Sequence, residues 1–145
     1  MSIELEKMAS ETQLLHGRFL NDRRALSRRR AELVEESKSQ VSTWELTRPH
    51  SDDLENGFLE QRKAIVSIND EFTDWTRRYN AGQRQVQAQL TSPSESDLPT
   101  KISDVRRLRG ELLRNFEVEL PLLEKIVRRL ENAVGVLSSF NSAPE

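Results

Sequence analysis

LENGFLEQRKAIVSINDEFTDWTRRYNAGQRQV, residues 54–86, carries the most regular apolar pattern of the chain. Large apolar side chains recur there at every seventh position, at Phe58, Ile65, Phe72, Tyr79 and Val86, with Leu54, Ile68 and Trp75 at the complementary positions. A sustained heptad repeat keeps one face of a helix against a partner helix along its whole length. The stretch therefore predicts a helix with coiled-coil-like packing.

Two polar breaks divide the chain on either side of this stretch. The runs 47–51 and 91–100 contain proline together with serine and threonine, a composition typical of loops. Outside them, apolar residues follow helical spacing. We therefore expect helices at about 2–46, 52–90 and 100–140, loops at 47–51 and 91–99, and a frayed tail at 141–145.

Local signals indicate how the second helix begins. Asp52 is placed to cap it, and Glu55 follows three residues later, as in a capping box. Acidic residues in a first helical turn are also favoured by the helix dipole.

The third segment carries a proline within its helical pattern. Its apolar residues are spaced by four from Leu108 to Leu120, which departs from the heptad, and Pro121 follows. Proline inside a helix removes one hydrogen bond, and its ring collides with the carbonyl four residues before it. A kink or short break is therefore expected between Glu117 and Pro121.

The fold class expected from these segments is an elongated all-α three-helix antiparallel bundle or coiled coil, forming a single domain over residues 1–145. Each segment has about 40 residues, and short loops join only neighbouring helix ends, which favours an up-down-up order. The hydrophobic fraction of 35% is below the roughly 45–50% of globular domains, as expected for helices with wide polar faces. The expected core consists of Phe58, Ile65, Ile68, Phe72, Trp75, Tyr79, Val86, Leu112, Phe116, Leu123, Val127 and Leu130.

The first segment contains the basic block NDRRALSRRR at residues 21–30. In a helix of about 3.6 residues per turn, Arg23 and Arg30 share one face with apolar residues, which we call the arginine seam. A buried guanidinium is unfavourable unless it is paired, so these arginines are expected to meet carboxylates or a hydrated groove. The candidate carboxylates within the chain are Glu111, Glu117, Glu119 and Glu124.

A partner-binding role for the first helix follows as a hypothesis. A helix whose apolar stripe is interrupted often completes its packing against another chain, so we expect a homo- or hetero-oligomer with other proteins as partners. Nucleic acid has less support as a ligand of Arg23–Arg30, because the net charge is −2 and no aromatic residues lie between the arginines. The residues of the partner-binding hypothesis are Phe19, Arg23, Leu26, Arg30, Leu33 and Trp44.

The residue types of the chain do not indicate a catalytic site. The chain has no cysteine, and its two histidines, His16 and His50, belong to no metal-ligand spacing and to no set with a nucleophile. Glycine-rich phosphate-binding motifs are absent from the sequence. We therefore expect no catalytic residue, metal, cofactor or small-molecule substrate.

Sequence signals for targeting are equally sparse. The N-terminal residues lack the pattern of a signal peptide, and no stretch approaches the ~18 apolar residues of a membrane span. We expect a soluble cytoplasmic protein without membrane insertion, and a nuclear location is compatible with the same features.

The function favoured by these features is that of a non-enzymatic coiled-coil subunit or adaptor of a larger intracellular assembly, acting through helix–helix contacts. The alternative is a small helical chaperone or regulator that sequesters a partner helix. Ser92 and Ser94, in an acidic loop that contains proline, are the expected phosphorylation sites.

Overall fold

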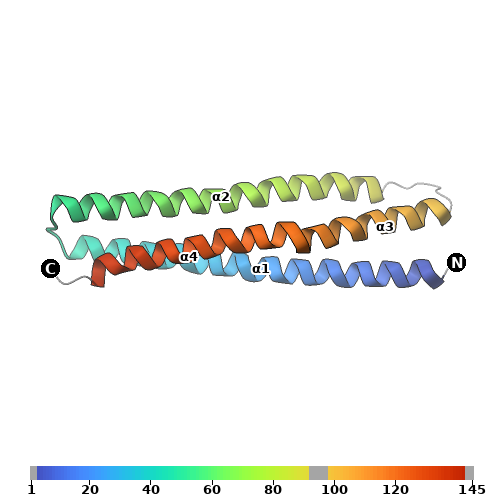
Figure 1. Ribbon diagram of the computed structural model, residues 1–145, viewed down its shortest axis with the longest axis horizontal. Coiled ribbons are helices and arrows are strands. Elements are labelled where there is room, and N and C mark those ends of the chain that lie inside the picture. Colours follow the sequence, from blue (N-terminus) through green and yellow to red (C-terminus); the bar gives the residue numbers. More distant parts are fainter. Residues whose placement is uncertain (1–2, 92–97, 143–145) are drawn as a thin grey trace. The chain divides into compact units, whose positions relative to one another are not determined.

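The protein is helical over nearly all of the described chain. This computed structural model describes residues 3–91 and 98–142, without the side chains of Leu5, 83–91 and 98–102. Its elements are α1 (Ile3–Leu46), α2 (Asp52–Thr91), α3 (Leu98–Arg114), the π-helical turn η1 (Asn115–Glu119) and α4 (Leu120–Ser142) (Figure 1). Because α3, η1 and α4 follow one another without a break, they form one third helical segment, and the all-α three-helix bundle expected from the sequence is confirmed.

The helix ends lie close to those expected. α1 has 44 residues and α2 has 40. The third segment begins at Leu98, so Pro99 falls in a first turn, where the N–H that proline lacks has no helical partner. Asn141 and Ser142, expected in a frayed tail, belong to α4, where the Asn141 amide Nδ2 donates to the backbone oxygen of Gln40 at 2.9 Å and to its Oε1 at 2.8 Å; residues 143–145 of the expected tail lie outside the described residues.

Ser51, rather than Asp52, caps α2. The Leu54 N–H donates to Ser51 Oγ at 3.3 Å, and the Glu55 N–H donates to the Ser51 carbonyl at 2.9 Å. Serine is among the preferred N-cap residues. The capping box expected with Glu55 is therefore wrong, and Glu55 instead forms an ion pair with Arg48 at 3.7 Å.

The interruption expected near Pro121 takes the form of the π-helical turn η1. The Leu120 N–H donates to the carbonyl of Asn115, five residues before it. Such a turn inserts an extra residue and leaves one carbonyl without a helical donor. Pro121 has no N–H and cannot donate to a carbonyl of the preceding turn. Because the π-helical turn already leaves one carbonyl without a donor, α4 continues through the proline without losing a further hydrogen bond.

By its contacts the chain divides into two compact units. Unit 1 comprises residues 1–25 and 76–122, and unit 2 comprises residues 26–75 and 123–145. Each unit draws on α1, on α2 and on the third segment. The single domain expected from the sequence stays a prediction.

Unit 2 is a three-helix core in which α2 runs opposite to α1 and α4. Trp44, near the end of α1, stacks on Phe58, near the start of α2, with ring centres 4.4 Å apart. Gln40 of α1 contacts Asn141 near the end of α4, which places these two helices parallel. Burial of one large apolar side chain contributes about 1.5–3 kcal/mol, so the shared seam is the main source of stability. Its buried residues include Leu33, Ile65, Phe72, Leu123, Leu130, Val134 and Leu137.

Unit 1 brings the start of α1 beside α3 in parallel. Arg106 lies 3.8 Å from Glu4, and Arg109 lies 3.5 Å from Glu11, so both helices advance in the same direction. These ion pairs are exposed and contribute little stability. The buried residues of unit 1 include Met8, Thr12, Phe19, Leu112, Asn115 and Leu120.

An aromatic cluster closes unit 2 beside the loop at 47–51. The Trp44 ring lies between those of His50, at 3.5 Å, and Phe58, at 4.4 Å, and Phe140 meets it edge-on at 6.0 Å. Gly57 permits this approach, because a Cβ added there would lie 3.1 Å from two atoms of the Phe140 ring. Trp44 is therefore an internal packing residue.

Candidate functional site

The two arginines of the arginine seam lie over aromatic rings of α2, and the buried Nε of Arg30 donates to no described acceptor. In unit 1, the Arg23 guanidinium lies 5.1 Å from the centre of the Tyr79 ring, and its Nη2 donates to Asn80 Oδ1 at 2.8 Å. In unit 2, Arg30 lies 5.0 Å from the centre of the Phe72 ring. A guanidinium over an aromatic face gains about 0.5–2 kcal/mol. Both arginines thus lie against apolar neighbours in an arrangement not expected from the sequence.

Tyr79 is the centre of a polar cluster within unit 1. Its hydroxyl accepts a hydrogen bond from Nδ2 of Asn115, a buried residue of η1, at 2.7 Å. Burial raises the pKa of Tyr79 to about 12, against the opposing effects of the Arg23 charge and the Asn115 hydrogen bond. Burial also lowers the pKa of Arg23. The cluster therefore holds a neutral phenol beside a guanidinium.

The titration of Tyr79 gives a direct test of this cluster. Tyr79 is the single tyrosine of the chain, so phenolate absorbance reports it specifically. We expect a midpoint of about 12 in the folded protein and about 10 in denaturant. Between these pH values only the unfolded state releases the proton, so the stabilisation is complete below about pH 10 and is lost as the pH rises through the folded pKa.

The control for this titration is Tyr79→Phe, in which that part of the alkaline loss of stability should disappear. A midpoint near the ordinary tyrosine value in the folded protein would contradict the burial of the hydroxyl.

The residues of the partner-binding hypothesis lie largely inside the chain. Phe19, Leu33 and Trp44 are buried, and Leu26 is half-buried. Phe19 contacts Tyr79 at 5.3 Å and the edge of Phe116 at 5.7 Å. This differs from the expected interaction surface, because other helices of the same chain cover the arginine seam. We do not propose this face as a partner-binding surface.

The described side chains of the expected core are buried or half-buried within the two units. Tyr79 and Phe116 are half-buried. Val86 lies outside the described side chains, and Ser92 and Ser94 lie outside the described residues, so their roles stay predictions. The buried members are Phe58, Ile65, Ile68, Phe72, Trp75, Leu112, Leu123, Val127 and Leu130.

The basic block has much of its charge engaged within the chain. Arg29 lies 3.3 Å from Glu32 and 3.5 Å from Glu131, while Arg23 and Arg30 lie over aromatic rings. A nucleic-acid site needs cations that are free to meet phosphates. The contacts of these three arginines therefore give no support to a nucleic-acid site at the basic block.

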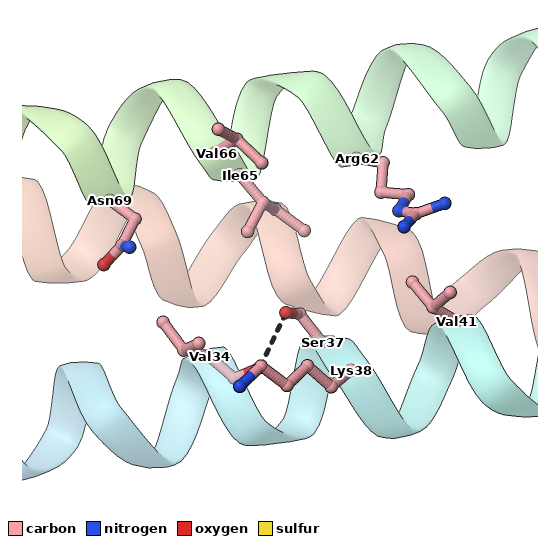
Figure 2. Close-up of a pocket in the computed structure, with 8 residues that line it drawn as sticks. All are labelled: Val34, Ser37, Lys38, Val41, Arg62, Ile65, Val66 and Asn69. Atoms are coloured by element: carbon pink, nitrogen blue, oxygen red, sulfur yellow. Dashed lines mark hydrogen bonds between the residues drawn. The ribbon is translucent and has the colours of Figure 1, made fainter.

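A groove between α1 and α2 is a candidate site in unit 2. Its volume is about 280 Å³. Ile65 forms a buried wall with 5% of its surface exposed, whereas the adjacent Val66 is 59% exposed. Figure 2 shows the lining residues, which are Val34, Ser37, Lys38 and Val41 of α1 and Arg62, Ile65, Val66 and Asn69 of α2.

Several polar groups of this groove lack a hydrogen-bond or ion-pair partner among the described residues of the facing helix. Asn69 Oδ1 is buried and accepts no hydrogen bond from any described residue. Lys38 Nζ lies 3.2 Å from Glu35, but both side chains are exposed, and such pairs contribute at most about 1 kcal/mol. Arg62 is exposed. Since none of the described lining residues is acidic, the groove combines apolar walls with two cations and an unpaired acceptor.

A second hollow in unit 2, between α1 and α4, differs in its electrostatics. It is larger, about 700 Å³, and its lining includes Arg29, Glu36 and Glu131. Arg29 pairs with Glu131 across it at 3.5 Å. The only cation among its described lining residues is therefore already paired, whereas Arg62 of the α1–α2 groove has no ion pair with a described residue.

Sequence reasoning from a single heptad seam missed the groove. The signal that could have found it is a set of apolar doublets, Leu33-Val34, Phe58-Leu59 and Ile65-Val66. In each doublet the first residue is buried and the second is more exposed. A doublet widens the apolar stripe beyond one interface, which indicates a second contact surface on the same helix.

None of the described helices is both long enough and apolar enough to cross a membrane. Over residues 3–91 and 98–142, no three His, Asp or Glu side chains gather into a group that could hold a metal ion.

Comparison with protein families, curated proteins and solved structures finds no match to this chain.

Proposed function

We propose that this chain is a non-enzymatic helical subunit or adaptor, and that a helix of a partner protein binds in the α1–α2 groove of unit 2. The observation that carries the proposal is Val66, an apolar side chain 59% exposed at the rim of a groove whose wall is the buried Ile65. An amphipathic helix laid in such a groove removes apolar surface from water. It would act as a fourth helix on unit 2, as in four-helix bundles.

The spacing of the exposed and half-buried apolar residues supports a helix as the ligand. Leu59 and Val66 are seven residues apart on α2, and Val34 and Val41 are seven apart on α1. Leu59 is also exposed. Residues at heptad spacing repeat along one face, so an incoming helix would meet apolar side chains from both sides at each second turn. This is the geometry needed for knobs-into-holes packing.

The proposal is tested by crosslinking from the groove. A photoreactive phenylalanine derivative replaces Val66 in the full chain, and the same residue replaces Val136, which is 48% exposed on α4, as the control. We expect residue 66 to crosslink to a helical segment of a second polypeptide, and residue 136 to give little of that product. Isotope-mixed protein distinguishes a second copy from contacts within one chain. Crosslinks from residue 66 confined to its own chain would overturn the proposal.

Binding to the crosslinked partner should also depend on the groove valines. Val66→Ser and Val41→Ser each remove apolar contact area, and we expect each to weaken binding by about tenfold, measured by titration calorimetry. Val136→Ser is the matched control and should leave the affinity unchanged. Because Val66 is exposed in the free chain, its change should leave thermal unfolding within experimental error of the wild type.

A further inference from the structure

We infer that the partner helix is acidic, with an apolar seam flanked by Glu or Asp residues that bind Lys38 and Arg62. This inference rests on the proposed function, because it names the chemistry of the ligand of the same groove. Two observations support it. Lys38 and Arg62 lie on opposite sides of the groove, and two other helix contacts of unit 2 each pair a cation with an acid of the neighbouring helix.

The two cations flank the groove from opposite sides. Lys38 belongs to α1 and Arg62 belongs to α2, and Figure 2 shows them on the two ribbons that border the groove. A helix lying between α1 and α2 would therefore meet one cation on each side of its apolar seam. These are the places taken by the charged flanking residues of coiled coils, where opposite charges select the partner. The Arg62 guanidinium also suits a carboxylate, which it can bind through two parallel hydrogen bonds.

The other helix contacts of unit 2 show the pattern that an acidic helix would complete. Arg29 of α1 pairs with Glu131 of α4 at 3.5 Å, and Arg129 of α4 pairs with Glu71 of α2 at 2.6 Å. Each of these two interfaces thus joins a cation to an acid of the neighbouring helix. In the α1–α2 groove, no described residue of the facing helix neutralises Lys38 or Arg62.

Asn69 lines the groove, and its buried Oδ1 accepts no hydrogen bond from the described residues. A Gln side chain on the incoming helix would donate to it once the Asn69 side chain turned toward the groove. Nucleic acid fits the groove less well, because the described lining contains valine and isoleucine but no aromatic ring on which a base could stack.

The test uses two synthetic amphipathic helices of three to four heptads that differ only in their flanking residues. Both carry the same leucine seam and one central Gln, and the flanking positions are all Glu in one peptide and all Lys in the other. Binding to the full chain is measured by fluorescence anisotropy at low salt. We expect the wild type to bind the Glu peptide at least about tenfold more tightly than the Lys peptide, and added salt to reduce the difference.

Two double variants, which change the net charge by the same amount, show whether the preference for the Glu peptide depends on the groove. Lys38→Glu/Arg62→Glu should abolish or reverse the preference. Lys125→Glu/Arg128→Glu, which changes two exposed cations of α4 outside the groove, should retain it. Both double variants must keep the circular dichroism spectrum of the wild type. If they do and both lose the preference alike, general electrostatic attraction explains the binding and the inference is overturned.

Each remaining outcome separates this inference from the proposed function. Equal binding of both peptides that is lost in Val66→Ser overturns the acidic partner and leaves a helix-binding groove. Binding that survives Val66→Ser overturns both proposals. Failure to bind either peptide, or tighter binding of an RNA or DNA oligonucleotide, overturns the inference, and the crosslinks from residue 66 then decide the proposed function separately.

Discussion

Phe19→Ala is expected to lower the free energy of unfolding by about 3–5 kcal/mol. Phe19 has no exposed surface, and its ring contacts those of Tyr79 at 5.3 Å and Phe116 at 5.7 Å. The change removes these ring contacts and leaves a cavity in the core of unit 1. Since small proteins have a total stability of about 5–15 kcal/mol, the loss should be evident in urea denaturation followed by circular dichroism.

The matched control for Phe19→Ala lies on the same helix. Leu14 is 70% exposed, so Leu14→Ala should change the stability by no more than about 0.5 kcal/mol. In Phe19→Ala, water entering the cavity should also bring the pKa of Tyr79 closer to the ordinary tyrosine value, because burial is the main cause of its shift. A stability loss no greater than that of Leu14→Ala would contradict the packing of unit 1.

Trp44→Ala should cost a similar amount, about 3–5 kcal/mol, in unit 2. Only 2% of Trp44 is exposed, and its ring lies between those of His50 and Phe58 with Phe140 at its edge. Alanine would remove the ring that holds the loop residue His50 against the helices. The measurement is again urea denaturation, with loss of the near-ultraviolet circular dichroism of the cluster as a second signal.

Trp44→Phe separates packing from hydrogen bonding at this position. The indole Nε1 is buried and donates to no described acceptor, an arrangement that costs roughly 1–3 kcal/mol. Phenylalanine keeps an aromatic face for stacking and removes this group, so we expect the stability to stay within about 1.5 kcal/mol of the wild type. A loss as large as that of Trp44→Ala would show that the full size of the indole is required.

The sequence alone determined the helices and the inward face of α2. Phe58, Ile65 and Phe72 repeat every seven residues, and a helix with that period has one apolar side whatever its neighbours are. Pro121 likewise located the interruption of the third segment, because the missing N–H is a local property of proline. The form of the interruption, a π-helical turn, could not be read in this way, since it depends on which carbonyl each N–H finds after packing.

Tertiary structure decided which groups meet across the helices. Periodicity placed Arg23 and Arg30 on the apolar face and required partners for them, but their positions relative to α2 determined that Arg23 lies over Tyr79 and Arg30 over Phe72. That register is set by the packing of the helices against one another, and no spacing within α1 contains it. The carboxylates expected as partners of these two arginines stay a prediction.

The groove depended on tertiary structure for the same reason. Ile65 and Val66 are adjacent apolar residues, and by hydrophobicity either of them could lie in the core. Only the positions of the neighbouring helices bury one and leave the other exposed. The same packing brings Lys38 of α1 and Arg62 of α2 to one groove, although they are distant in the sequence. A helical period determines the face on which a residue lies, whereas the neighbour across that face is determined by the fold.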